Sequence, residues 1–147
     1  MQIIKVTSNK KQYLPLLLLA DEEEAMIDRY LERGTMYVLE DGDVKAECLV
    51  TDEGDGILEL KSLAVLPPFQ RRGYAKALLN FIEAEYKGRF KILQVGTGDS
   101  PATVPFYQKL SFVRSHIIKN FFTDNYSRPI YDGGVLLKDM VYLRKQL

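Results

Sequence analysis

Residues 59–75 read ELKSLAVLPPFQRRGYA and contain, in order, a strand, a turn and the start of a helix. The apolar run ending in Leu63, Ala64 and Val65 predicts a buried strand, which stops at residues 67–68 because two prolines cannot donate to a sheet ladder. Helical spacing of apolar residues begins directly after Gly73. A helix start offers free backbone N–H groups and a partial positive charge, so this turn suits an anion such as a pyrophosphate.

The turn itself supplies further features for binding an anion. Gly73 lacks a Cβ and would let the ligand approach the backbone, while Arg71 and Arg72 add positive charge. The pattern Gln70-x-x-Gly73-x-Ala75 resembles Q/R-x-x-G-x-G/A, the acyl-CoA-binding signature of the GNAT N-acetyltransferase superfamily. Residues 106–112, FYQKLSF, resemble the second signature of that family, F-Y-x-K-x-G-F, in the same order and at the same spacing.

The rest of the chain predicts an α+β fold in a single domain over residues 1–147, in the order βααβββαβαββ. This order is similar to the GNAT fold, which has a central, mixed but mostly antiparallel sheet of about seven strands flanked by helices. The expected strands cover residues 2–6, 35–40, 44–51, 57–65, 92–95, 112–122 and 136–143. The expected helices cover residues 10–20, 21–34, 74–88 and 100–110, with Asp21 and Ser100 as N-caps of the second and last, and residues 96–99 and 123–134 are expected to be loops.

Composition excludes several other classes of function. Lys plus Arg and Asp plus Glu both number 20, and this zero net charge argues against general nucleic-acid binding. The single cysteine, Cys48, and the single histidine, His116, cannot form a disulfide, a zinc cluster or a multi-histidine site, so no metal is expected. Cys48 lies in the apolar run 46–50, which favours a buried structural thiol. The apolar stretch 14–20 is too short to span a membrane, so a cytoplasmic protein without membrane contact is expected.

The resemblance implies acetyl-CoA as co-substrate and transfer of its acetyl group to a primary amine by direct attack. It also implies that the strand Leu63, Ala64 and Val65 pairs with the pantetheine arm, and that the Leu63 N–H polarises the thioester carbonyl. Ser100 stands where the family often has Asn and would bond to the same arm. The pyrophosphate would lie on the turn that Gln70 opens, held by the backbone N–H groups of Arg71, Arg72, Gly73, Tyr74 and Ala75.

Two side chains are candidates for proton transfer. Glu59 lies six residues before Val65, where family members that use a glutamate base carry it; the alternative is a surface carboxylate paired with Lys61. Strict alternation would put Glu59 and Leu63 on one face, but the family often has a bulge in this strand, so parity leaves the role of Glu59 open. Tyr107 matches the family's tyrosine that returns a proton to the CoA thiolate; the alternative is an aromatic core residue.

The acceptor is the least determined part of the prediction. The acidic residues 21–24 and the loop 124–132 could face a cationic amine, or both could be ordinary solvated segments. The aromatic residues in and beside this loop are expected to border either the acceptor site or a contact between copies, such as a homodimer. A CoA-binding module without catalysis, and a protein N-terminus or lysine as acceptor, are the alternative functions.

Overall fold

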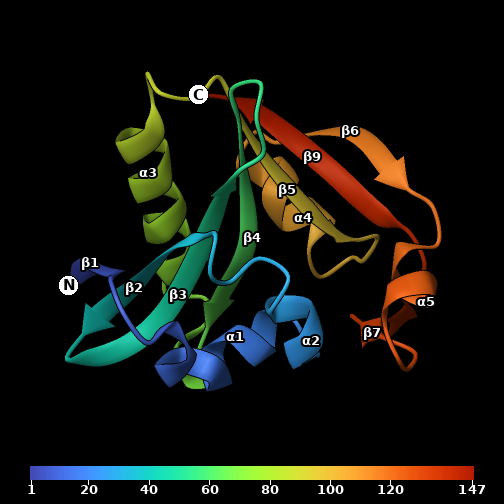
Figure 1. Cartoon of the computed structure of the whole chain (residues 1–147), viewed down its shortest axis with the longest axis horizontal. Helices are drawn as coiled ribbons and strands as arrows, with labels where there is room; N and C mark the ends of the chain where they lie inside the picture. The colour runs from blue at the N-terminus through green and yellow to red at the C-terminus, as the bar shows by residue number, and fades with distance from the viewer. The chain divides into compact units, whose positions relative to one another are not determined.

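The structure is a computed structural model that describes all 147 residues, and it divides into two compact units. The first unit comprises residues 1–91 with Leu147, and the second comprises residues 92–146. Figure 1 shows the elements of both, and each unit is described by itself below. No helix is long and apolar enough to cross a membrane.

The first unit is built on four consecutive antiparallel strands. These are β1 (Gln2–Val6), β2 (Thr35–Asp41), β3 (Asp43–Asp52) and β4 (Ile57–Val65), each paired with the next along the chain. Gly42, with φ +84°, makes the tight turn between β2 and β3. The strand that ends before the double proline is therefore confirmed as β4.

Helices cover both faces of these strands. On one face a 3₁₀ turn (Lys10–Tyr13), α1 (Leu14–Ala20) and α2 (Glu24–Ile27) close a core around Leu17, Ile27 and Leu49. On the other face lies α3 (Tyr74–Tyr86), as Figure 1 shows. Its Phe81 ring meets the ring of Tyr37 of β2 edge-on, with the ring centres 5.0 Å apart. Since side chains alternate along a strand, the odd-numbered Tyr37 and the even-numbered Met36 and Val38 belong to these two different faces.

The prediction of a helix over residues 21–34 is wrong in length. Its helical part, α2, ends at Ile27, and Asp21 is not its cap, because the helix begins at Glu24 with Glu23 at the N-cap position. The Asp21 carboxylate instead accepts a hydrogen bond from the Tyr30 hydroxyl at 3.2 Å. Turns follow α2 as far as Gly34. The apolar side chains of this range, Ile27, Tyr30 and Leu31, are nevertheless buried in one cluster with Leu17 of α1 and Met36 and Leu49 of the sheet.

A bulge interrupts the pairing of β3 with β4. Leu49 lies opposite Ser62 and Val50 lies opposite Leu60, which leaves Lys61 as the extra residue. Alternation therefore changes phase at Lys61. As a result the Glu59 side chain points to the α1 face and the Leu63 side chain points to the α3 face. The two residues therefore do not share a face, as strict alternation would have placed them.

The second unit contains three antiparallel strands and two short helices. β9 (Met140–Gln146) lies between β5 (Ile92–Gly98) and β6 (Val113–Ile118). With the four strands of the first unit these three make the seven strands that the sequence predicts. The helices are α4 (Val104–Lys109) and α5 (Phe121–Asn125), and a small ribbon pairs β7 (Tyr131–Asp132) with β8 (Val135–Leu136).

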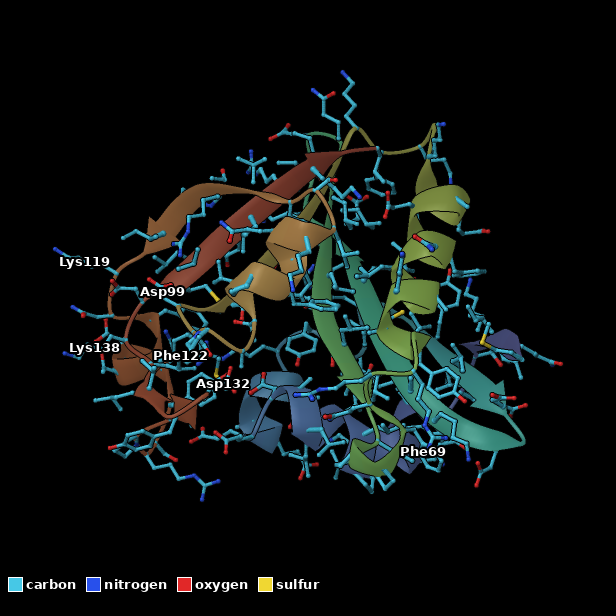
Figure 2. All side chains as sticks on the ribbon, turned by 180° about the vertical axis from the view of Figure 1, so that it is seen from behind. Phe69, Asp99, Lys119, Phe122, Asp132 and Lys138 are labelled. Carbon is cyan, nitrogen blue, oxygen red and sulfur yellow. The ribbon has the colours of Figure 1, made fainter.

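Several predicted boundaries in this unit are wrong. The expected loop at residues 96–99 is mostly strand, because β5 continues to Gly98, which pairs with Met140. The strand expected over 112–122 ends at Ile118, and the loop expected over 123–134 contains the end of α5 and β7. The last strand starts at Met140 rather than at residue 136, and Leu137 is buried in a cluster with Ile130 and Phe122, the last of which Figure 2 labels.

Candidate active site

The turn between β4 and α3 is held in an open shape by its own residues. The Gln70 side-chain amide donates to the Val65 carbonyl at 3.2 Å, and Gly73 adopts φ +88° just before the helix. No side chain caps the first turn of α3. A Cβ placed on Gly73 would meet nothing within 4 Å, so no other part of the protein crowds this residue.

Positive charge surrounds this turn. Arg71 and Arg72 are exposed, and the Arg72 guanidinium lies 5.3 Å from the ring centre of Phe69, which Figure 2 labels. The Lys45 ammonium lies over the same ring at 3.9 Å. Cations held beside uncapped N–H groups give this region the character of a phosphate-binding site.

Tyr74 fixes the start of the helix to the sheet. Its hydroxyl donates to the Asp41 carboxylate at 2.6 Å, and this hydrogen bond raises the pKa of the tyrosine. The bond joins the first residue of α3 to the last residue of β2, so the turn cannot move far from the strands.

The strand before the turn lies against β3. Leu63 is opposite Cys48 and Val65 is opposite Ala46, while Ala64 is buried. The Cys48 thiol is fully buried, and burial raises its pKa well above the usual value. Cys48 is thus a structural thiol, as the sequence predicts.

Glu59 is buried rather than exposed. Only 4% of the residue is accessible to solvent, and its carboxylate forms an ion pair with the Lys61 ammonium at 2.8 Å. The partner that the sequence suggests is therefore present, but the pair lies inside the fold, and its role in proton transfer stays a prediction.

A second buried carboxylate lies on the same face of the strands as Glu59, four pairs further along the register, and the sequence analysis missed it. Glu47 of β3 is inaccessible to solvent, and the Ser62 hydroxyl of β4 donates to its Oε1 at 2.6 Å. Burial raises the pKa of Glu47 to about 7, and the Ser62 hydrogen bond only partly offsets this. A glutamate within the apolar run 46–50 was the one signal that could have revealed it.

Ser100 and Tyr107 belong to the second unit. Ser100 is buried, and its hydroxyl accepts from the Ala102 N–H at 3.0 Å and donates to the Asp132 carbonyl at 3.3 Å. The prediction that Ser100 caps the helix is wrong, because α4 begins at Val104 after Thr103. Its hydroxyl instead joins its own loop, at Ala102, to Asp132 of β7.

Tyr107 lies in α4 and is 8% exposed. Its ring packs edge-on against Phe106 at 5.1 Å and against Phe112 at 5.4 Å. These contacts fix the ring, and the part of the hydroxyl in catalysis stays a prediction.

The structure thus groups most predicted site residues in the first unit, along β4 and the turn after it.

No group of three or more His, Cys, Asp or Glu residues is arranged to hold a metal.

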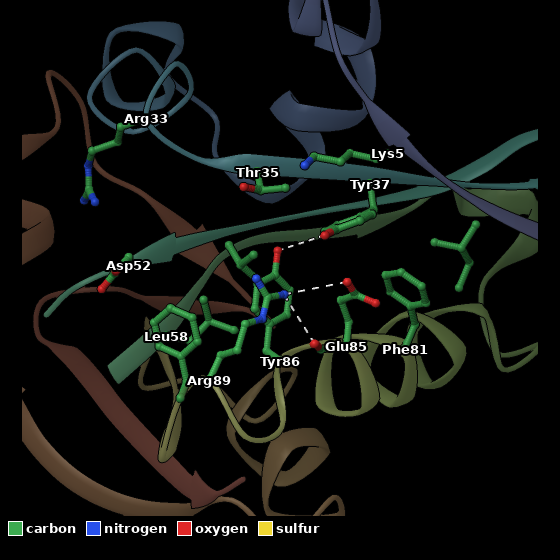
Figure 3. Close-up of a pocket in the computed structure, with 13 residues that line it drawn as sticks. Lys5, Arg33, Thr35, Tyr37, Asp52, Leu58, Phe81, Glu85, Tyr86 and Arg89 are labelled. Carbon is green, nitrogen blue, oxygen red and sulfur yellow. Dashed lines mark hydrogen bonds and ion pairs between the residues drawn. The ribbon is translucent and has the colours of Figure 1, made fainter. Parts of the chain in front are cut away.

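A pocket of about 500 Å³ lies elsewhere in the first unit, around the end of α3 (Figure 3). The Tyr37 and Tyr86 hydroxyls meet there at 2.8 Å, and Arg89 pairs with Glu85 at 3.6 Å. None of the predicted site residues lines it. The lining residues are Ile3, Lys5, Arg33, Thr35, Tyr37, Val50, Asp52, Leu58, Phe81, Glu85, Tyr86, Arg89 and Phe90.

Comparison with known proteins identifies the family. The profile of the acetyltransferase (GNAT) domain matches residues 32–114, a range that includes β4, the turn, α3 and Tyr107. The chain belongs to the GNAT acetyltransferase family. An uncharacterized N-acetyltransferase of Bacillus subtilis, YvbK, is 35% identical over 131 residues, which cover 87% of this chain and 84% of that protein.

Solved structures confirm the GNAT fold over nearly the whole chain. A GNAT acetyltransferase from Elizabethkingia anophelis with acetyl-CoA bound is 33% identical, with a TM-score of 0.92 over 99% of this chain and 97% of that one. A Bacillus subtilis acetyltransferase in complex with CoA is 31% identical, with a TM-score of 0.89 over 99% and 98% of the two chains. An IAA acetyltransferase from Bacillus cereus is 30% identical, with a TM-score of 0.89 over 99% of this chain and all of that one.

Proposed function

We propose that this GNAT acetyltransferase transfers the acetyl group of acetyl-CoA to a primary amine by direct attack. The observation that carries the proposal is the turn after β4, with its open Gly73, uncapped helix start and exposed arginines. The similarity of the whole chain to two acetyltransferases whose structures contain acetyl-CoA and CoA supports the same ligand here.

In the proposed reaction the amine nitrogen attacks the thioester carbonyl, the carbon–sulfur bond breaks, and CoA leaves as a thiolate. The Leu63 N–H donates to the carbonyl oxygen as negative charge develops on it. The backbone N–H groups from Arg71 to Ala75 hold the pyrophosphate. These roles follow from the family resemblance and agree with the open turn.

Two protons must move in this reaction. An alkylammonium is protonated at pH 7, so the amine must lose a proton before it attacks. The CoA thiolate must gain one, and Tyr107 is the proposed donor because a phenol can give a proton and recover it. Glu59 is the residue that the resemblance proposes as base, although its carboxylate is already paired with Lys61.

Ligand-induced stabilisation and turnover test the proposal together. Acetyl-CoA at a hundredfold excess over its dissociation constant should stabilise the fold by about 2.7 kcal/mol, a rise in Tm of roughly 5–10 °C. Release of free thiol in the presence of a panel of amines, peptide N-termini and lysine peptides then identifies the acceptor class. Absence of any Tm shift would remove the proposal, and a shift without thiol release would favour a CoA-binding module without catalysis.

Tyr107→Phe tests the proposed acid. The substitution keeps the ring packed against Phe106 and Phe112 and removes only the hydroxyl. We expect kcat to fall roughly ten- to a thousandfold while KM for acetyl-CoA changes little, because the lost interaction matters mainly in the transition state. Phe106→Leu, which alters an aromatic neighbour without touching the hydroxyl, is the control. Full kcat in Tyr107→Phe would leave Tyr107 as a packing residue.

A further inference from the structure

Glu47 is the one buried polar side chain whose hydrogen-bonding capacity is plainly incomplete. Its Oε1 accepts from Ser62, but its Oε2 has no hydrogen-bond partner, and the residue is inaccessible to solvent. Burying a carboxylate with one oxygen unpaired costs free energy, so the fold alone gives no reason for a glutamate here. Its register partner on β2, Val38, shows that an aliphatic side chain fits this layer.

The position of Ser62 links this carboxylate to the strand that carries the proposed chemistry. Ser62 directly precedes Leu63, whose N–H is the proposed donor to the thioester carbonyl. Register places Glu47, Ser62 and Glu59 on the α1 face, because Glu47 pairs opposite Ala64 and the bulge at Lys61 restores Glu59 to the same side. The buried carboxylate is therefore bonded to the residue that directly precedes Leu63 on β4.

We propose that Ser62 and Glu47 form a proton relay that accepts the proton of the acceptor ammonium. The inference rests on the proposed function and assigns a step of it to residues outside the family signatures. The ammonium gives a proton to the Ser62 oxygen while the Ser62 hydrogen passes to Glu47 Oε1, so the amine becomes neutral and Glu47 becomes a carboxylic acid. After acetyl transfer Glu47 returns the proton to solvent by the same hydroxyl.

The two glutamates on this face differ in a way that favours Glu47 as the acceptor. Glu59 is bonded to the Lys61 ammonium at 2.8 Å, and protonation would break that ion pair. Glu47 has no cation beside it, and burial holds its pKa at about 7, which matches the working pH of a general base.

The charged and titratable groups around Glu47 are engaged with other partners. On β3, Lys45 bonds to Asp43 and lies over Phe69, and the neighbouring Cys48 thiol faces the opposite side. Helix α1 carries no titratable side chain at all. The remaining titratable groups that pack near this face are Tyr13 and Tyr30, which join the core cluster around Val38, the Glu59–Lys61 pair, and Glu24 of α2, which pairs with Lys11.

The pH dependence of turnover tests the relay. With butylamine and tyramine as probe acceptors, kcat/KM for the amine should rise with pH through about 7 as Glu47 loses its proton. This rise with pH is the limb of the pH profile that the relay predicts. In Glu47→Gln the limb should disappear, and kcat/KM should fall by roughly a hundred- to ten-thousandfold. The Tm shift with acetyl-CoA should stay as in the wild type, because the pyrophosphate turn is untouched.

Ser62→Ala and the double variant distinguish a relay from a packing role. Ser62→Ala should lower kcat/KM about as much as Glu47→Gln, and the double variant should be little worse than either, because the two groups act as one unit. If the losses of kcat/KM in the two single variants add up in the double variant, and the rise with pH is unchanged, the relay is overturned. Ser62 and Glu47 would then be a hydrogen-bonded pair with a structural role. Loss of the limb in Glu59→Gln but not in Glu47→Gln would also overturn it, in favour of Glu59.

A stability measurement gives a readout that needs no turnover. Burial raises the pKa of Glu47 from its ordinary value of 4.5 to about 7, so the folded chain keeps this proton to a higher pH than the unfolded chain does. The stability of the wild type should therefore fall between pH 4.5 and pH 7 relative to that of Glu47→Gln. Equal pH dependence in the two chains would overturn a titrating Glu47. If the wild-type chain acetylates no amine, the proposed function fails before any variant is made, and the relay fails with it. Normal wild-type turnover with an intact limb in Glu47→Gln removes the relay alone.

Discussion

The two ends of helix α3 carry similar residues, a glycine at positive φ and an arginine beside an aromatic ring, but differ in whether their polar groups have partners. At the start, Gly73 has φ +88°, and Arg72 is exposed beside an aromatic ring. At the end, Gly88 has φ +93°, and Arg89 lies over the Tyr86 ring at 4.7 Å. A Cβ on either glycine would meet nothing within 4 Å.

What differs is how the backbone groups and charges are used. At the end of α3, Arg89 is bonded to Glu85, the Lys87 N–H bonds to the Glu83 carbonyl, and the tyrosine hydroxyls satisfy each other. At the start, no side chain caps the helix, and Arg72 has no ion-pair partner. The protein pairs the groups at the end of the helix with one another and leaves unpaired those at the start, which is proposed to hold acetyl-CoA.

The glycines give the sharpest test of this contrast. Gly73→Ala and Gly88→Ala both force an L side chain to positive φ, so each should destabilise the fold by about 1–2 kcal/mol. Only Gly73→Ala should weaken acetyl-CoA binding, by roughly a hundredfold, because its methyl group displaces the pyrophosphate from at least two charge-assisted hydrogen bonds. Isothermal titration with CoA and chemical unfolding measure the two effects separately. Equal losses of affinity in both variants would mean that strain, rather than contact, explains the result.

The arginines give a smaller effect at the same two places. Arg72→Ala should raise KM for acetyl-CoA by roughly threefold to tenfold at low salt, since one exposed cation beside a phosphate is lost. The difference should shrink at high salt, where screening weakens the wild-type attraction. Arg89→Ala also removes one cation and one ring contact, and it should leave KM unchanged. A matching rise in KM for Arg89→Ala would assign the effect to net charge rather than to the turn.

The sequence predicted the first of these ends well because its signals are local. The double proline, Gly73 and the apolar spacing after it act within a few residues of each other, so strand, turn and helix could be placed without knowledge of the fold. In the second unit the same reasoning failed at Gly96 and Gly98, since glycines commonly end strands. There a Cβ on Gly98 would lie 2.5 Å from a methyl carbon of Leu137, so a distant side chain explains the glycine.

Only those residues of the candidate site that lie in or beside the two family signatures could be predicted from the sequence. Glu59 and the turn follow from position along one strand, but the bulge at Lys61 depends on pairing with β3. Glu47 meets Ser62 across fifteen residues of sequence, and nothing local predicts that contact. The second carboxylate therefore became visible only when the register of β3 and β4 was known.

The smallest effect concerns the tyrosine pair that closes the far end of α3. The Tyr37 and Tyr86 hydroxyls are 2.8 Å apart in a buried setting, and burial followed by this bond raises the pKa of Tyr37 above its usual range (Figure 3). Tyr37→Phe removes one hydroxyl at nearly constant volume and should cost about 1 kcal/mol, or roughly 2–4 °C in Tm. Tyr86→Phe should cost a similar amount, and the double variant should cost less than the sum, because both substitutions remove the same bond. In all three chains kcat and KM for acetyl-CoA should equal the wild-type values. A fall of several-fold in kcat, with only this small loss of stability, would show that the closed end of α3 is coupled to catalysis and that the contrast between the two ends is wrong.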